Sequence, residues 1–287
     1  MINRSLSVYY PLIPNMGDIL NVTIIEKLFG FKVKQRSHLT CDLNAIGSSL
    51  ESYTLHGGFK YRLKLKFYGL IYPSVSIWGT GFISSNKGGD APFYRRKMRF
   101  TAVRGQLSKK RVEAIIGKKL DIPTGDAGIL SSYIITPPPL KKYKVGIISH
   151  WREQDDPDWK KLLNNYDNAT FIDIRQHPTV VIPQIAECEY IISSSLHGLI
   201  VADSFNIPNI HVVMTDKPLG DGFKFDDYYS AYGIEHTCLD MKKDAFPTLE
   251  WIKDNYKITQ DMVEKKKIEM IKAFPFKNEN APILSMI

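Results

Sequence analysis

The chain has 287 residues, of which 44% are hydrophobic and 24% are charged. This composition excludes an intrinsically disordered protein and indicates a soluble globular fold long enough for two domains of ordinary size. The net charge of +8 favours an anionic partner, and a nucleic acid, an anionic membrane surface and a phosphorylated small substrate all satisfy that condition.

The N-terminal apolar run is short and is interrupted by Pro11 and Pro14, so we expect no signal peptide. No uninterrupted apolar run is long enough to span a bilayer. The three cysteines are isolated and show neither metal-ligand spacing nor a disulfide framework, which fits a reducing cytosol. We therefore expect a cytoplasmic protein with at most peripheral contact with the inner, anionic face of a membrane.

The first strand-loop-helix crossover is expected near the N-terminus. Residues 6–13 are typical of a buried strand, and residues 19–29 of a helix with one apolar side. The polar turn between them contains Asn15, Gly17, Asp18 and Asn21. Gly17 permits close approach of a backbone, and an N-cap is the role that the residues alone predict for Asp18.

Two later strands are expected to end in turns that suit a ligand. Residues 75–82 predict a strand that runs into Gly79 and Gly81, where either a plain turn or ligand-binding backbone N–H groups would fit. The third glycine of a dinucleotide fingerprint is missing. Arg104 follows another short strand, and the carboxyl end of a strand in an open α/β sheet is where such folds bind ligands. Its guanidinium suits a carboxylate or a phosphate.

The segment Thr136-Pro-Pro-Pro-Leu140 predicts a linker, because three prolines continue neither a helix nor a sheet. We therefore expect an N-terminal domain of residues 1–136 and a C-terminal domain of residues 137–287. The same alternation of strands and helices restarts after the linker, which predicts two α/β domains of similar architecture. A charged amphipathic helix is expected at residues 252–273 and is free to pack back on the first domain.

In the second half, residues 144–149 predict a strand with His150 and Arg152 at its tip. These two side chains either face the histidine of the next turn or form an exposed loop. Residues 190–192 predict a further buried strand, and the polar turn after it contains Ser193, Ser194, Ser195, His197 and Gly198. A helix that starts at such a turn directs hydroxyl and backbone N–H groups at an anion. A serine-capped helix with a satisfied histidine is the alternative, but the whole group in one turn favours function.

The segment Ser193-Ser-Ser-Leu-His-Gly198, followed by an Ala-Asp pair and by Ile207-Pro208, resembles the signature of the polysaccharide pyruvyl transferase family. The turn at Asp18, the Arg104 segment and the segment from Lys224 to Ser230 are also similar to that family. The resemblance runs from Asn15 to Ser230 and is strongest at the histidine turn. It implies two Rossmann-like domains that face each other across a cleft, a GT-B-like α/β arrangement.

The resemblance implies an enzyme of exopolysaccharide or capsule biosynthesis. It would transfer pyruvate from phosphoenolpyruvate to hydroxyls of a sugar, in a polysaccharide or in a lipid-linked precursor, and form a pyruvate ketal with release of phosphate. His197 is then the proton donor or a ligand of the leaving phosphate, and Asp18 positions or deprotonates the sugar hydroxyl. The scheme needs no metal and no cofactor beyond the donor substrate.

Further residues are expected to contact the two substrates. The donor-binding set is Arg104, Ser193, Ser194, Ser195, Lys224, Gly79 and Gly81. The set expected to contact either acceptor or donor is Asn15, Gly17, Asn21, His150 and Arg152. Arg62, Lys64 and Lys66 alternate with apolar residues in the region of weakest resemblance, so they belong either to an edge strand or to the acceptor site.

Three other functions are compatible with parts of the pattern. A GT-B glycosyltransferase would share the cleft and the positive charge but would bind a nucleotide sugar. A non-catalytic glycan-binding protein would need no proton donor. A nucleic-acid-binding protein fits the charge, but the sequence has no helix-turn-helix, zinc-finger or RNP pattern, so we expect no nucleic acid partner.

Overall fold

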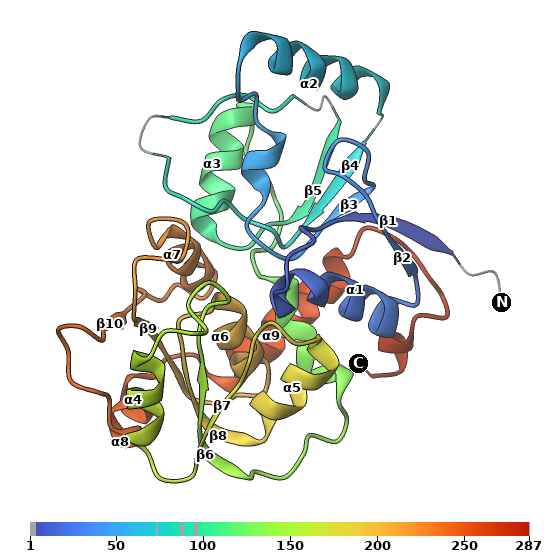
Figure 1. Cartoon of the computed structure of the whole chain (residues 1–287). Helices are drawn as coiled ribbons and strands as arrows, with labels where there is room; N and C mark the ends of the chain where they lie inside the picture. Colours follow the sequence, from blue (N-terminus) through green and yellow to red (C-terminus); the bar gives the residue numbers. More distant parts are fainter. Residues whose placement is uncertain (1–3, 73, 87–88, 95–96, 287) are drawn as a thin grey trace.

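The computed structural model describes residues 4–72, 74–86, 89–94 and 97–286. In this part of the chain, two five-stranded sheets stand one after the other in the sequence, with helices packed around each (Figure 1). Within each sheet, the neighbouring strands pair in parallel. The α/β class expected from the sequence is therefore confirmed.

The first sheet has the strand order β2-β1-β3-β4-β5. Its strands are β1 (Ser5–Tyr9), β2 (Lys32–Gln35), β3 (Leu43–Asn44), β4 (Val75–Trp78) and β5 (Met98–Ala102). The helical elements of this half are α1 (Met16–Phe29), η1 (Leu50–Tyr53), α2 (Phe59–Ile71), α3 (Gln106–Ile116) and η2 (Ala127–Ile134).

The second sheet has the order β10-β9-β8-β6-β7. Its strands are β6 (Tyr143–Ile148), β7 (Ala169–Phe171), β8 (Cys188–Ser193), β9 (Asn209–Val213) and β10 (Cys238–Asp240). Its helical elements are α4 (Asp158–Asn164), α5 (Pro178–Ala186), α6 (Leu196–Ser204), α7 (Phe223–Ser230), α8 (Leu249–Asn255), α9 (Gln260–Ala273) and η3 (Pro282–Ser285).

The two sheets share one topology. When the strands of each half are numbered separately, both orders read 2-1-3-4-5, a doubly wound arrangement in which the chain changes direction between the first and third strands. That switch point lies between β1 and β3 in the first half and between β6 and β8 in the second. Ligands of open α/β sheets bind outside the carboxyl ends of the strands at this point. The fold therefore predicts that ligands bind at the loops after β1 and β3 and at the loops after β6 and β8.

Helix α1 begins and ends where its sequence dictates. Asn15 caps it by accepting a hydrogen bond from the backbone N–H of Gly17, at 3.3 Å. Gly30 ends it in the left-handed conformation, with φ 69°. This N-cap is Asn15, not Asp18 as the sequence suggested. Asp18 lies in the first turn, and its carboxylate accepts a hydrogen bond from the Asn15 amide at 2.9 Å.

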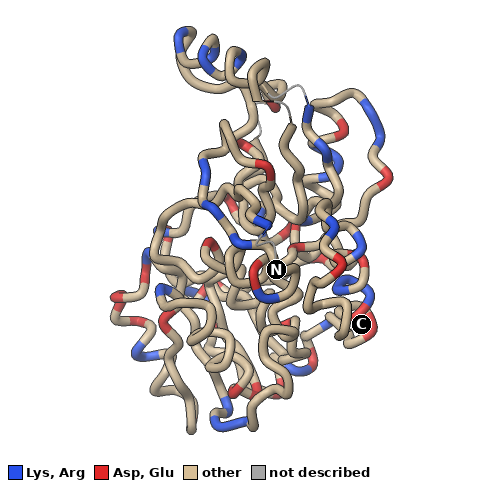
Figure 2. Tube along the Cα trace, turned by 90° about the vertical axis from the view of Figure 1, so that its right-hand side faces the viewer, with Lys and Arg blue, Asp and Glu red and all other residues tan. Residues whose placement is uncertain are grey.

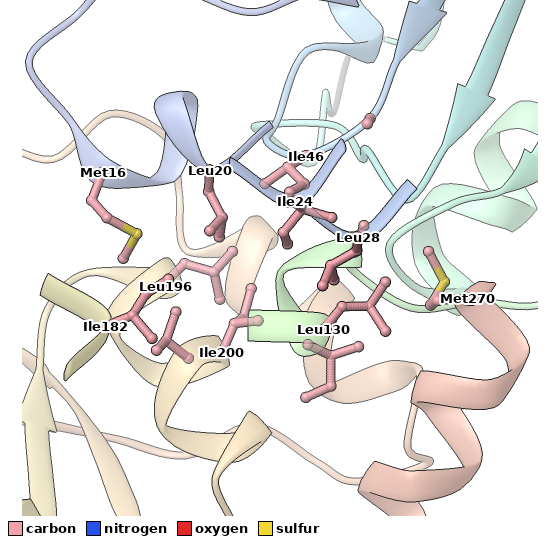
Figure 3. Packing of buried hydrophobic residues seen from close by; sticks show 14 of the residues in the cluster. Met16, Leu20, Ile24, Leu28, Ile46, Leu130, Ile182, Leu196, Ile200 and Met270 are labelled. Carbon is pink, nitrogen blue, oxygen red and sulfur yellow. The ribbon is translucent and has the colours of Figure 1, made fainter. Parts of the chain in front are cut away.

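The largest apolar core lies between the two halves. Leu20 and Ile24 of α1 belong to the same buried cluster as Leu130 of η2, Leu196 and Ile200 of α6 (Figure 3). At its other end, the indole N–H of Trp78 in β4 donates to the Met270 carbonyl of α9 at 2.9 Å, so α9 packs against the first sheet. Because this core crosses residue 136, the domain boundary placed there stays a prediction.

Two expectations about individual segments were wrong. The helix expected at residues 252–273 is two helices, α8 and α9, and Thr259 caps the second by accepting from the Met262 N–H. Arg62, Lys64 and Lys66 lie on helix α2 and not on an edge strand. None of these three lines the cavity of about 170 Å³ that lies where the switch points of the two sheets meet.

Candidate functional site

A cavity of about 170 Å³ lies where the switch points of the two sheets meet. The loops after β1 and β3, with Ile83, contribute Pro11, Ile13, Asn15, Asp18, Ile46, Gly47, Ser48, Ser49 and Ile83. The second half contributes His150, Trp151, Arg152, Ser195, Leu196, His197, Leu219 and Lys224. The cavity is smaller than the roughly 300–1,000 Å³ of pockets for drug-sized ligands, so it suits a small molecule.

The turn of Ser193, Ser194 and Ser195, called the serine turn below, leads into α6, and its three serines have different roles. The Ser193 hydroxyl accepts from the Ser195 N–H at 2.9 Å and donates to the Ser195 carbonyl at 3.0 Å. The Ser194 hydroxyl accepts from the His150 N–H at 2.8 Å and donates to Glu153. Only Ser195 lines the cavity, and its side chain makes no capping bond to the helix. Ser193 and Ser194 therefore shape the turn, and Ser194 also lines the neighbouring cavity. Their expected contact with the donor stays a prediction.

His197 lies in the first turn of α6, and its ring packs against the other half of the protein. A Cβ atom on Gly17 would lie 2.1 Å from its Nδ1 atom, so the contact requires glycine. Its Nε2 atom is buried and has no hydrogen-bond partner among the described residues. Burial, then the charges of Lys224 and Arg104, lower the pKa of His197 to about 3. With a pKa this low, the ring is neutral near pH 7.

A second neutral histidine lies at the tip of β6. The Nδ1 atom of His150 accepts from the Arg152 N–H at 3.3 Å, which places the ring proton of the neutral form on Nε2. Burial and the charges of Lys224 and Arg152 lower the pKa of His150 to about 3. The cavity therefore holds two uncharged imidazoles in a positive environment.

Lys224, in the first turn of α7, is the buried cation of the cavity. It is only 9% exposed, and no described carboxylate forms an ion pair with it. Burial, followed by the charge of Arg104, lowers the pKa of Lys224 to about 8. Glu153 and Asp18 oppose this shift but form no ion pair with the ammonium, so an anion bound in the cavity would stabilise it further.

Asp18 is the carboxylate of the cavity. It is buried, and burial raises its pKa to about 6, although the hydrogen bond from Asn15 and the charge of Lys224 oppose the shift. A carboxyl group with a pKa near neutrality can exchange a proton with a bound hydroxyl. Asn21, expected nearby, bonds instead to both backbone groups of Ile46 and holds that loop in place.

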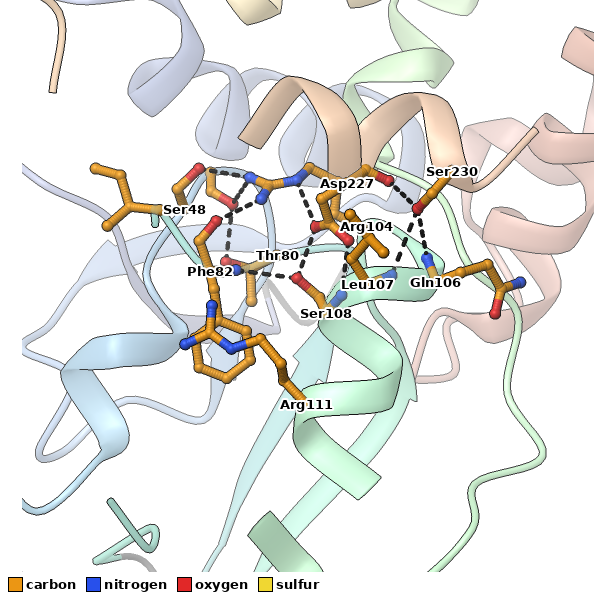
Figure 4. A network of polar contacts seen from close by, with 12 residues as sticks. Ser48, Thr80, Phe82, Arg104, Gln106, Leu107, Ser108, Arg111, Asp227 and Ser230 are labelled. Carbon is orange, nitrogen blue, oxygen red and sulfur yellow. Dashed lines mark hydrogen bonds and ion pairs between the residues drawn. The ribbon is translucent and has the colours of Figure 1, made fainter. Parts of the chain in front are cut away.

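Arg104 does not line the cavity, which corrects a central expectation. Its side chain is fully buried, and its Nε atom donates to Asp227 of α7 at 2.9 Å (Figure 4). Its remaining N–H groups donate to Phe82, to Gly47 and to the Ser48 hydroxyl. The guanidinium thus ties the two halves together and fixes the Gly47–Ser48 loop, while its charge still acts on His197 and Lys224.

Gly79 and Gly81 are also structural. Gly79 has φ +93°, which favours glycine, and a Cβ on Gly81 would lie 2.6 Å from the Arg104 guanidinium. Neither lines the cavity. Gly81 makes room for the ion pair between Arg104 and Asp227, whereas Gly79 packs closely against Ala127 and Met270. Their expected contact with the donor stays a prediction.

Sequence analysis missed the Gly47-Ser48-Ser49 loop, which lies on the cavity wall. The only signal was a Gly-Ser-Ser run after Asn44. The strand before it, β3, has two residues and is too short to show a periodicity. Glu153 was also missed. Its carboxylate accepts hydrogen bonds from the hydroxyls of Ser194 and Thr215, so it fixes the position of the serine turn relative to the segment after β9.

One group of potential metal ligands lies outside this cavity. Within the part of the chain that the structure describes, ligand atoms of His211, His236 and Cys238 lie within 4.8 Å of one another. The two imidazoles already bond to each other, with His211 Nδ1 and His236 Nε2 2.9 Å apart, and Asp226 holds the far nitrogen of His236. These residues line a neighbouring cavity of about 470 Å³ that shares Leu219 and Lys224 with the first. The absence of a metal requirement stays a prediction.

The chain thus consists of two doubly wound α/β halves, and a cavity lined by the basic residues Arg152 and Lys224 lies where their switch points meet. A model of the polysaccharide pyruvyl transferase family matches residues 45–216, and the chain belongs to that family. Its members transfer pyruvyl groups to polysaccharides, so this chain is a transferase of polysaccharide biosynthesis.

Two relatives were found by sequence. The uncharacterized protein L143 of Acanthamoeba polyphaga mimivirus is 30% identical, over 77% of this chain and 72% of its own length. The succinoglycan biosynthesis protein ExoV of Rhizobium meliloti (strain 1021) is 29% identical over 96 residues, which are 33% of this chain and 29% of ExoV.

Two solved structures of the E. coli heptosyltransferase WaaC, with ADP-2-deoxy-2-fluoro heptose and with ADP, align at TM-scores of 0.32 and 0.31. Their identities to this chain are 13% and 12%. The alignments cover 75% and 98% of this chain and 91% and 100% of theirs. Such low scores carry no argument about the donor. Among the described residues, helices fall short of the length and apolarity that crossing a bilayer requires.

Proposed function

We propose that the protein transfers the pyruvate unit of phosphoenolpyruvate to two hydroxyls of one sugar, forming a ketal and releasing phosphate. The observation that carries this proposal is the buried ammonium of Lys224, which forms no ion pair with a described carboxylate and lines a small cavity at the start of α6. Phosphoenolpyruvate brings a carboxylate and a phosphate on a three-carbon frame, and both groups need such donors.

The donor would lie between Lys224, Arg152 and the first backbone N–H groups of α6. These groups all belong to the second half, and Ser195 adds a hydroxyl beside them. A bound anion stabilises the charged forms of its neighbours, so it would raise the lowered pKa values of His197 and Lys224. His197 would therefore acquire its proton together with the donor.

The chemistry then follows in balanced steps. His197 protonates the CH₂ carbon of the enol, which gives an oxocarbenium-like centre at the neighbouring carbon, and a sugar hydroxyl attacks that centre and loses its proton. The C–O bond to phosphate breaks, and the second hydroxyl attacks the same carbon. Of the two hydroxyl protons, one restores His197 and the other leaves with phosphate. Asp18, with a pKa of about 6, takes up the second of these protons from an attacking hydroxyl and passes it on to the departing phosphate, so that it ends the cycle unchanged.

The acceptor would approach from the neighbouring cavity, which is larger and shares Lys224 and Leu219 with the first. We propose a sugar of a polysaccharide or of a lipid-linked precursor, at the cytoplasmic face of a membrane that the protein contacts peripherally. The family supports a saccharide acceptor in general.

The test is incubation with phosphoenolpyruvate and a panel of synthetic and lipid-linked sugars, with phosphate release and the mass of the glycan measured together. We expect one phosphate for each gain of a pyruvate ketal. Thermal stabilisation by UDP- or GDP-sugars and not by phosphoenolpyruvate would instead identify a nucleotide-sugar glycosyltransferase. Glycan binding without turnover would identify a lectin-like protein.

A further inference from the structure

Helix α2 presents an apolar stripe to solvent. The residues of this stripe are between 51% and 77% exposed and are Phe59, Leu63, Phe67, Leu70 and Ile71. At about 100° per residue, Phe59, Leu63, Phe67 and Leu70 fall within an arc of about 80°, and Ile71 widens it to about 120°. The helix is held on the protein by its other side, where Leu65 and Gly69 are buried. A Cβ on Gly69 would lie 2.2 Å from the Tyr94 carbonyl oxygen, so that contact is close.

Basic side chains border the stripe on both sides. On the same helical projection, Lys60 falls between Phe67 and Ile71 at one edge of the stripe and Lys64 follows just beyond it, while Arg62 and Lys66 follow the other edge. Residues 59–71 contain no Asp or Glu. Figure 2 shows these positive positions on the helix at the outer end of the first domain.

Other basic segments of the protein differ from α2. In α9, Lys266 pairs with Glu269 and Lys267 with Glu264, each on the same helix. Such pairs are typical of a solvated helix face. Helix α2 carries four positive charges that no acidic residue of its own balances, next to exposed aromatic and aliphatic side chains. This combination calls for a partner that is both anionic and apolar.

We propose that α2 is a membrane-docking helix that lies in the plane of an anionic lipid surface. Its apolar stripe would enter the boundary between headgroups and acyl chains, while the four basic side chains extend toward the lipid phosphates. Charge complementarity selects this occupant. A nucleic acid offers no apolar layer for the stripe, and two copies of α2 facing each other would repel. This inference rests on the proposed function only for the reason why the enzyme would need a membrane.

The first test measures sedimentation of the full chain with vesicles of phosphatidylglycerol and phosphatidylcholine, without donor or sugar. We expect binding that weakens steeply with salt and with removal of phosphatidylglycerol. The pair Lys60→Glu and Lys64→Glu should weaken it by about 30-fold or more, because each lysine at an anionic surface contributes roughly fivefold. The control pair Lys110→Glu and Lys118→Glu changes the net charge equally on exposed sites of and beside α3 and should have less than a third of that effect on a logarithmic scale.

The second test removes the apolar stripe. Leu63→Gln with Phe67→Gln keeps helix propensity and charge but should weaken vesicle binding by about tenfold or more. The control pair Leu140→Gln and Leu284→Gln removes exposed leucines elsewhere and should leave binding unchanged. Thermal unfolding of each variant shows whether the fold is retained.

The proposal fails if the wild-type chain does not bind anionic vesicles, or if the α2 variants bind them as well as the control variants do. It also fails if loss of the apolar stripe abolishes a dimer or binding to RNA but leaves vesicle binding unchanged. Pyruvylation of a short soluble acceptor is measured in parallel. If vesicle binding follows α2 while no variant pyruvylates, the proposed function fails and the docking surface stands. If the protein pyruvylates the soluble acceptor but does not bind vesicles, the docking surface fails and the proposed function stands.

Discussion

The two switch points occupy the same place in the same topology, yet they supply opposite chemistry. The loops after β1 and β3 offer a carboxylate and hydroxyls, from Asp18, Ser48 and Ser49. The loops after β6 and β8 and the start of α7 offer imidazoles and cations. Under the proposed function, the second half would hold the anionic donor, and Asp18 of the first half would meet the hydroxyls of an acceptor that enters from the neighbouring cavity. The halves meet where Gly17 leaves room for His197.

The largest expected effect tests the donor half. Changing His197 to Gln should lower kcat by about 10²–10⁴, because it removes the proposed proton donor. The fold should survive, since the Nε2 atom of the ring makes no hydrogen bond to a described residue. Phosphate release in a coupled assay measures the rate, and His56→Gln, at an exposed site, is the control. Near-normal turnover in folded protein would remove His197 from the chemistry.

The next effect tests the tie between the halves. Arg104→Met leaves Asp227 buried without its cation and should lower the free energy of unfolding by about 3–5 kcal/mol. Urea unfolding measures this, and Arg175→Met, at the partly exposed pair with Asp173, should cost at most about 1 kcal/mol. A loss confined to the KM for phosphoenolpyruvate, without a loss of stability, would restore the direct contact with the donor that the sequence predicted.

A smaller effect tests the unpaired cation of the donor half. Lys224→Met should weaken binding of phosphoenolpyruvate about 10- to 100-fold, the scale of a lost charge-assisted hydrogen bond. Calorimetric titration measures the affinity. Lys217→Met is the matched control, because this exposed lysine precedes α7 but pairs with Asp156. If both variants bind phosphoenolpyruvate with the same affinity, the proposal that Lys224 holds an anionic group of this donor is wrong.

The smallest effect tests the acceptor half. Burial raises the pKa of Asp18 to about 6, above the unfolded value, so ionisation destabilises the fold and stability is lost as the pH rises through 6. Asp18→Asn should therefore raise the free energy of unfolding by about 1–2 kcal/mol at pH 7.5. The gain should fade between pH 6 and pH 4, where the wild-type carboxyl is protonated. Thermal unfolding of both proteins across this pH range measures the gain in stability. The turnover of Asp18→Asn should fall although its stability rises. A gain that is independent of pH would show that Asp18 is not the cause.

Much of the architecture was predictable because local patterns dictate it. Alternating strands and helices, the polar turn at Asn15 and the serine turn before α6 all follow from short-range preferences. The pattern failed at α2, where Arg62, Lys64 and Lys66 alternate with apolar residues as in an edge strand. A helix forms there because Leu65 and Gly69, four residues apart, pack on the segment at Tyr94. That contact lies 25 residues away from Gly69 in the chain, beyond any local pattern.

Taken alone, the sequence determined the residue types at the ends of the strands, and with them the location of the site at His197, Asp18 and Lys224. Only the tertiary structure decided which charged groups are paired. Arg104 and Lys224 are both cations from motif-like segments, but Asp227 meets the first and no described carboxylate meets the second. The physical reason is that burial and long-range pairing set the charge and availability of a group, and neither is encoded in the spacing of residues along the chain.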